Sequence, residues 1–292
     1  MRRFPIFLFL TFAVFLSFGT AHAQPVLQDK SRGVILDEML PEMREIDSVR
    51  LRVSYIATTV TDTIQDLRGE EKMVLDIGES VVKYYSDLYN GIVYLLSNGF
   101  AVIDVLSTIG YEKDSDTWFA SIYEASYLNM PDGRITTTGR IGSNDFIYEQ
   151  ELPQINWHIE DSIRTINGYQ SQKATCIYKG RHYTAWFTPE IPVPYGPWEF
   201  HGLPGLIVSV SDADNYYTFK MADISRPEDA VILYPEYDYI RTTRAKYLDL
   251  RKKIEADFGY YFNNFKGQSG MEIVVPEDYE PKALRNDFIE LE

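Results

Sequence analysis

The chain has 292 residues, and its 28 Lys and Arg against 43 Asp and Glu give a formal net charge of −15. This acidic balance argues against a protein that binds nucleic acid or an anionic membrane surface. One Cys excludes a disulfide framework within the chain, and 45% apolar residues are enough for a globular core.

The N-terminus has the pattern of a secretory signal peptide. Two Arg precede an apolar run, Phe4 to Phe18, and small residues follow at Ala21 and Ala23. Because the run is too short to cross a bilayer comfortably, we expect cleavage after residues 1–23 and favour this over a retained anchor. Gln24 follows, so the Cys of a bacterial lipoprotein is missing. The sequence predicts an exported protein with no transmembrane segment after signal removal.

The rest of the chain predicts one α+β domain. Residues 24–47 are polar and interrupted by Pro41, which indicates a loose N-terminal segment. Helical apolar spacing predicts helices over 86–109, with a break at Asn98-Gly99, and over 242–258. Period-two alternation predicts antiparallel strands at 51–57, 72–78, 80–85, 117–128, 134–140, 146–152, 165–169, 173–178, 182–187, 206–211 and 216–222.

This order of elements favours a large curved antiparallel β-sheet, a meander resembling half a barrel, with a few helices packed on it. The domain spans residues 48–258, and residues 259–292 form an acidic C-terminal tail. A charged connection is expected at 65–71. Pro-Asp-Gly within 129–133 predicts a turn.

A Pro-rich loop over 189–204 ends in a distinctive corner. We interpret Leu203-Pro204-Gly205-Leu206 as a type II turn, with both Leu side chains in the core and Gly205 supplying a positive φ. Gly202 is expected to let the backbone pass close to a bulky side chain, Trp198 or Phe200. The turn formed by Gly202, Leu203, Pro204 and Gly205 is therefore structural, because it lacks the residues of a phosphate-binding loop.

The run Gly202-Leu203-Pro204-Gly205-Leu206-Ile207 resembles the signature of the GLPGLI family. Further matches are Ile166-Asn167-Gly168-Tyr169, Lys173-Ala174-Thr175, Gly180-Arg181, Ala185-Trp186-Phe187, Ile191-Pro192 and Gly196-Pro197-Trp198-Glu199-Phe200. The resemblance covers most of residues 49–225. It implies an exported, mainly β protein of a Gram-negative bacterium and supplies no reaction, since the family's function is not established. Ser171 stands where members often carry Cys, which puts in doubt any role built on that thiol.

The residues give little support to catalysis. His158, His182 and His201 lack metal-site spacing, and no Gly-x-Ser-x-Gly motif occurs. We therefore assign no catalytic residue, metal or cofactor, and keep a hydrolase using His182 or His201 as the weakest of three hypotheses. Cys176 lies in a strand-like run and is expected to be a buried, inert thiol rather than a reactive one.

Two short segments carry further alternatives. Asp212-Ala213-Asp214-Asn215 echoes part of a calcium loop, but a hairpin turn is favoured. Arg181 is the best candidate for an anionic contact, against an ordinary salt bridge.

The aromatic residues pose the main question about function. They either fill the core, which is favoured, or line a cavity between the sheet and the helices. The candidate ligand-binding residues are Arg181, Trp186, Trp198, Phe200 and His201.

Two hypotheses stand above the hydrolase, and the sequence does not separate them. In one, the protein is a non-enzymatic binding or carrier module for an apolar or amphipathic ligand. In the other, it is an assembly protein that docks on an outer-membrane or other envelope protein.

Overall fold

The computed structural model describes residues 41–91, 124–141, 144–256 and 289, which all lie in the compact unit Gly33–Glu292. Several expectations fall outside these residues: the signal peptide 1–23, the segment 24–40, the predicted helix beyond residue 91, the strand residues 117–123 and the tail apart from Ile289. No helix in the described ranges is both long and apolar enough to span a bilayer.

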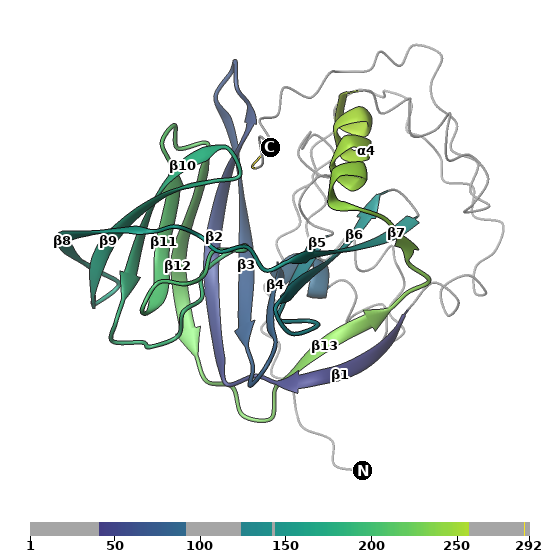
Figure 1. The fold of residues 1–292 in the computed structure, drawn as a ribbon, viewed down its shortest axis with the longest axis horizontal. Coiled ribbons are helices and arrows are strands. Elements are labelled where there is room, and N and C mark those ends of the chain that lie inside the picture. Colours follow the sequence, from purple (N-terminus) through teal and green to yellow (C-terminus); the bar gives the residue numbers. More distant parts are fainter. Residues whose placement is uncertain (1–40, 92–123, 142–143, 257–288, 290–292) are drawn as a thin grey trace, which may run out of the picture. The chain divides into compact units, whose positions relative to one another are not determined.

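The described residues form one large, open antiparallel sheet and a two-stranded ribbon (Figure 1). In the large sheet the strand order is β14-β7-β6-β5-β4-β3-β2-β12-β11-β10-β9-β8. Its strands are β2 (Leu51–Asp62), β3 (Leu67–Ile77), β4 (Val82–Ser86), β5 (Glu124–Leu128), β6 (Arg134–Ile141), β7 (Asn144–Glu151), β8 (His158–Ile166), β9 (Tyr169–Tyr178), β10 (Arg181–Thr188), β11 (Leu206–Asp212), β12 (Tyr217–Ser225) and β14 (Ile240–Arg241).

The strand order consists of two meanders, β2 to β7 and β8 to β12, joined by antiparallel pairing of β2 with β12. β14 pairs with β7 in the parallel sense, whereas the other neighbours are antiparallel. The curved antiparallel sheet of an α+β fold, predicted from the alternation, is thereby confirmed.

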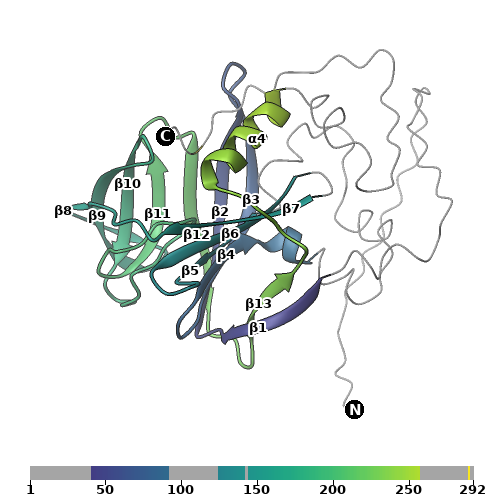
Figure 2. The same ribbon diagram turned by 45° about the vertical axis from the view of Figure 1, so that its right-hand side comes forward.

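The ribbon pairs β1 (Glu42–Ser48) with β13 (Val231–Glu236), which are far apart in the sequence (Figure 2). The expectation of a loose segment reaching residue 47 is therefore wrong for its last six residues. β1 consists mainly of charged and polar residues, so the alternation that marks a half-buried strand is weak there. Its order comes from pairing with β13.

Other element boundaries also differ from the sequence prediction. The charged connection at 65–71 is largely strand, because β3 begins at Leu67 and pairs with β2 along its whole length. The strand expected at 165–169 spans a turn at Asn167-Gly168 instead. The true strand, β8, was missed because it lies at the sheet edge and most of its side chains are exposed.

The described helix α4 (Arg244–Ala256) agrees with the helix predicted over 242–258. Its buried Tyr247 packs against Phe146 and Tyr148 of β7, with ring centroids 5.8 and 5.3 Å apart. Residues 87–91 are also helical, so the other predicted helix starts as expected.

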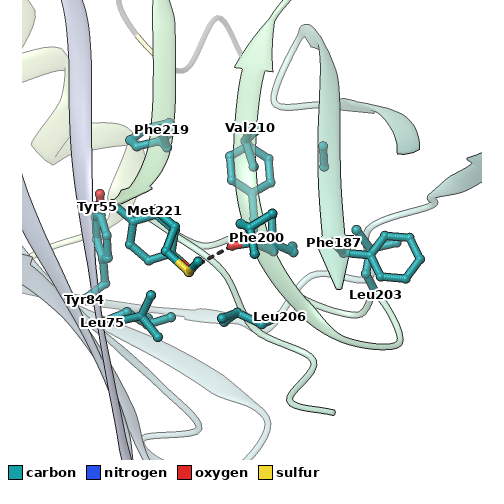
Figure 3. Close-up of a cluster of buried hydrophobic side chains, with 14 of the residues drawn as sticks. Tyr55, Leu75, Tyr84, Phe187, Phe200, Leu203, Leu206, Val210, Phe219 and Met221 are labelled. Atoms are coloured by element: carbon teal, nitrogen blue, oxygen red, sulfur yellow. Dashed lines mark hydrogen bonds between the residues drawn. The ribbon is translucent and has the colours of Figure 1, made fainter. Parts of the chain in front are cut away.

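The sheet buries side chains on both faces. One face, here called the core face, carries the larger cluster, which includes Ala185. Figure 3 shows Tyr55, Leu75 and Phe187 of this cluster. The opposite face, the ribbon face, carries Val74, Tyr85, Ala125, Tyr127 and Ile147, which pack with Tyr234 of the ribbon. The positions that determine function must therefore be sought on both faces and in the loops beyond them.

Candidate functional site

The loop between β10 and β11, residues Pro189–Gly205, is here called the corner loop. Backbone hydrogen bonds join parts of this loop to each other and to the sheet. Within the loop, Gly202 N–H donates to Pro194 O at 2.8 Å, and Tyr195 and His201 form an isolated antiparallel β-bridge. Two hydrogen bonds connect the loop to β11: Leu206 N–H donates to Ile191 O at 2.9 Å, and Ile207 N–H donates to Tyr195 O at 3.0 Å. The loop is thus held rigid although it contains no regular secondary structure.

The turn formed by residues 202–205 at the end of the corner loop, here called the glycine corner, is structural, but its geometry differs from the predicted type II turn. Gly205 N–H bonds to Leu203 O two residues back, while Leu206 N–H bonds to Ile191 O, so the hydrogen bond of a type II turn is absent. Leu203 and Leu206 are both buried in the core, as expected.

The reasons for glycine also differ from the prediction. A Cβ at Gly202 would meet nothing within 4 Å, so the expected close approach to Trp198 or Phe200 is wrong, and its φ of +91° explains the glycine. The close approach occurs at Gly205, where a Cβ would lie 2.1 Å from Thr188 O, and at Gly196, where it would lie 2.6 Å from the Ile207 Cβ. The corner loop therefore presses its backbone against β10 and β11.

The buried carboxylate of Glu199 connects the corner loop to neighbouring strands through hydrogen bonds. Glu199 is 1% exposed, and its Oε2 accepts hydrogen bonds from Lys179 Nζ at 2.5 Å and from the Tyr178 hydroxyl at 3.0 Å. Gln150 Nε2 donates to the other oxygen, Oε1, at 3.1 Å. The Lys179 ammonium also lies over the ring of Trp198, 4.6 Å from its centroid. Burial of such a pair is costly unless every charge is satisfied, and here three donors satisfy the carboxylate.

Two members of this cluster have unfavourable backbone conformations. Lys179 has a φ of +45° and Trp198 a φ of +55°, a region that residues other than Gly, Asn and Asp rarely occupy. The comparable loop between β8 and β9, Asn167-Gly168, uses the residues that such a turn prefers. Lys179 therefore occupies a position suited to Asn, where its side chain reaches Glu199. Backbone strain of this kind concentrates at functional sites.

Hydrogen bonds fix the residues that follow Glu199. His201 Nδ1 lies 2.7 Å from the main-chain oxygen of Glu199, and since that oxygen can only accept, Nδ1 carries a proton. The Trp157 indole donates to the main-chain oxygen of His201 at 2.8 Å. Phe200 is fully buried and contacts Trp198 with ring centroids 5.4 Å apart, and Figure 3 shows it among core side chains of β11 and β12. Of the predicted ligand-binding residues, Trp198, Phe200 and His201 thus belong to one assembly, in which Trp198 is partly buried.

The other two predicted residues lie elsewhere. Arg181 is buried, and its guanidinium donates to Asp212 Oδ2 and to the main-chain oxygen of Ile289, each at 3.2 Å. This is the salt-bridge alternative, and it also places one tail residue, Ile289, against the core. Trp186 lies on the face of β10 opposite Phe187, under the guanidinium of Arg164 at 3.8 Å. The five candidates therefore do not form a single site.

The imidazoles offer no hydrolytic arrangement within the described part of the chain. His182 is exposed, and neither His182 nor His201 makes a contact with a carboxylate there. No group of three or more His, Cys, Asp or Glu suited to a metal occurs among the described residues.

The remaining site predictions concern Asp212 and Cys176. The Asp212 segment is the predicted hairpin turn, with Tyr217 N–H donating to Asp212 Oδ1 at 2.8 Å. Cys176 is buried, and burial raises the pKa of its thiol to about 12, which agrees with an inert thiol.

Sequence reasoning missed Lys179, Tyr178 and Gln150 as members of the site. It considered Glu199 only as an acid beside His182 or His201 and not as the partner of Lys179. One feature of the sequence could have pointed to Lys179: the hairpin loop between β9 and β10 is Lys179-Gly180, whereas Asn-Gly is the preferred pair in such a loop. The partners of Lys179 could not be found, because Glu199 and Gln150 come from a loop and a strand that only the tertiary fold brings together.

Comparisons with known proteins supply no activity. Residues 170–209 match the model of a family described as a protein of unknown function, Porph_ging. No curated protein matches the chain. Among solved structures, PNGF-II in the P21 space group is 9% identical over 70% of this chain, with a TM-score of 0.46. PNGF-II in the C2 space group is 11% identical over 69%, with a TM-score of 0.45. The chain spans about one third of the length of these structures, 33% and 32%.

Proposed function

We propose that this is an exported, non-enzymatic binding protein of the cell envelope of a Gram-negative bacterium, and that its corner loop docks an envelope protein. Export rests on the N-terminal signal pattern and on the resemblance to the GLPGLI family. The observation that carries the docking role is the partly buried Trp198, held in a strained backbone conformation with its ring over the ammonium of the buried Lys179–Glu199 pair.

The physical argument is preorganisation. A loop that is already fixed by its own hydrogen bonds loses little conformational entropy when a partner binds it. Pro192 and Pro194 are exposed on this loop, so rigid apolar surface accompanies the ring of Trp198. Trp is the residue type most often found at the energetic centre of protein interfaces.

The alternative of a carrier with an aromatic-lined cavity has less physical support. Tyr183, Phe187 and Phe200 are each 1% exposed or less and belong to the core-face cluster, so these aromatic residues fill the core. Trp198 is available at the surface, whereas the rings behind it are not.

Site-specific photo-crosslinking in intact cells tests the proposal. A photoreactive residue at the exposed Pro194 should trap a discrete envelope protein, and the same adduct should disappear when Trp198→Ala is added. Trp186→Ala is the matched control, since it removes another half-buried Trp from a different face. An adduct that survives Trp198→Ala, or the absence of any adduct in a chain that is folded and exported, would overturn the docking role.

A further inference from the structure

A row of hydroxyl side chains crosses the ribbon face on the half of the sheet that contains β9 to β12. Strand register places Thr175 opposite Thr184, Thr184 opposite Ser211, Ser211 opposite Thr218, and Thr218 opposite Thr58 of β2. None of these five residues, here called the hydroxyl row, is buried. Because neighbouring strands lie about 4.8 Å apart, the row presents its five hydroxyl groups over a span of about 19 Å.

A depression on the same face, here called the trough, lies at one end of this row. It is open to solvent and has a volume of about 480 Å³. The trough runs between two cross-strand pairs: Thr175 and Thr184 of the hydroxyl row, and Ile177 and His182, which lie two residues further along β9 and β10. His158 of the edge strand β8 lies opposite Thr175 and also lines it. Its volume falls within the range of about 300–1,000 Å³ that is common for small-molecule sites.

The lining of the trough is polar and carries no permanent charge. Among the described residues, no Asp, Glu, Lys or Arg lines it. Its polar side chains on this face are two imidazoles, two hydroxyl groups and one amide, from His158, His182, Thr175, Thr184 and Asn156. No hydrogen bond joins any of these five side chains to another residue that the structure describes. They are therefore available to a ligand that both donates and accepts hydrogen bonds.

The composition of this surface also indicates the class of ligand. A phosphate or a carboxylate is usually bound by Arg or Lys, which the described lining lacks. Protein interfaces are enriched in aromatic side chains and poor in Ser, and Thr is under-represented among their energetically important residues. A surface of hydroxyl, amide and imidazole groups fits an uncharged, hydroxyl-rich ligand better than either of these.

We propose that the trough binds one sugar unit of a neutral glycan and that the hydroxyl row binds the units that follow. Sugar hydroxyl groups donate and accept hydrogen bonds, as the Thr hydroxyl and Asn amide groups do, while Ile177, which is 65% exposed, contacts the C–H groups of the sugar ring. The strand spacing of about 4.8 Å is close to the length of one unit in an extended β-1,4-linked chain, so successive sugars meet successive strands. The trough lies at the opposite end of β10 from the corner loop, and this site does not depend on the docking role.

Isothermal titration calorimetry of the purified protein tests the site with β-1,4-linked disaccharides and hexasaccharides of glucose, xylose and mannose. Hexagalacturonate serves as the anionic comparison. At least one neutral hexasaccharide should bind saturably, with a Kd of about 1 mM or tighter. The matching disaccharide should bind about tenfold or more weakly, because it loses the hydrogen bonds to the hydroxyl row. Hexagalacturonate should bind more weakly than the neutral hexasaccharide.

Single hydroxyl deletions locate the site on the sheet. Thr184→Val and Thr218→Val keep the branched shape of the side chain, and each should weaken the Kd for the hexasaccharide about threefold to tenfold. Thr59→Val is the matched control, since Thr59 is also partly exposed but follows Thr58 in β2 and therefore lies on the opposite face. Its affinity should equal that of the wild type. No binding of any neutral hexasaccharide, tighter binding of hexagalacturonate, or wild-type affinity in Thr184→Val or Thr218→Val would overturn the proposal.

A second measurement needs no variant. Diethyl pyrocarbonate modifies accessible imidazoles, and the bound hexasaccharide should protect His158 and His182, which line the trough. His201 of the corner loop should react equally with and without the glycan. Mass spectrometry of the digested protein reports all three residues. Equal modification of His182 in the presence and absence of the hexasaccharide would contradict a site in the trough.

Discussion

Removing both charges of the Lys179–Glu199 pair should destabilise the protein by much less than the sum of the two single removals. Lys179→Met leaves a carboxylate that is 1% exposed, with only the neutral donors Tyr178 and Gln150. Breaking a buried pair costs about 3–5 kcal/mol, and these two donors place the loss near the lower end, about 3 kcal/mol. Glu199→Gln leaves an ammonium whose side chain is 10% exposed and should cost about 2–3 kcal/mol.

The double variant Lys179→Met/Glu199→Gln retains no uncompensated charge, so its loss should stay near about 3 kcal/mol rather than reach the sum of the single losses. The coupling free energy is then about 2–3 kcal/mol. Urea unfolding followed by circular dichroism at pH 7 measures it, with equal m-values as the condition for comparing the four proteins. Losses that add to within about 0.5 kcal/mol would refute the account of the pair.

The same series tests the strain at the hairpin loop. Lys179→Asn removes the same charge as Lys179→Met but supplies a residue that tolerates a positive φ. The Asn variant should therefore be more stable than the Met variant by about 1 kcal/mol. Equal stabilities would show that the backbone at Lys179 stores no strain.

Two further predictions concern the ribbon face and the glycine corner. Burial lowers the pKa of Lys83 from 10.5 to about 8, so the unfolded chain binds the ammonium proton of Lys83 more strongly than the folded chain does. Burying the charged side chain therefore lowers the unfolding free energy below pH 8, and this loss is recovered as the pH rises from about 8 towards 10.5. The unfolding free energy of the wild type relative to Lys83→Met, from urea titrations, should rise by about 1 kcal/mol between pH 7 and pH 9. A constant difference would contradict the lowering of the Lys83 pKa by burial. Gly205→Ala should cost about 3 kcal/mol or more, because its Cβ would meet the Thr188 main chain, whereas Gly202→Ala meets no atom and should cost only about 1–2 kcal/mol. The two thermal unfolding curves should separate accordingly, and equal losses would contradict the close approach at Gly205.

The sequence was informative where local pattern and tertiary environment agree. Strands such as β10 alternate cleanly, with Tyr183, Ala185 and Phe187 on the core face, so their type could be read from period two. β8 and β1 could not be read in this way, since one lies exposed at the sheet edge and the other is ordered by pairing with β13.

The candidate site was only half accessible to sequence reasoning, for a related reason. Trp198, Phe200 and His201 are adjacent in the chain and stand out by residue type. Glu199 depends on Lys179 and Gln150, whose proximity only the fold creates. Lys83 has the sequence pattern of an ordinary strand residue. Nothing local in the sequence reveals that Arg52 and Tyr85 already donate hydrogen bonds to the carboxylate of Asp76, the residue opposite Lys83.

The central claim is that the corner loop is a rigid docking surface with Trp198 at its centre. Its most direct test is the yield of the crosslinked adduct from position 194 in intact cells, compared between the otherwise unchanged chain, Trp198→Ala and Trp186→Ala at equal levels of folded protein. The account predicts one discrete adduct that is lost only with Trp198→Ala. An adduct of equal yield in all three chains would contradict it.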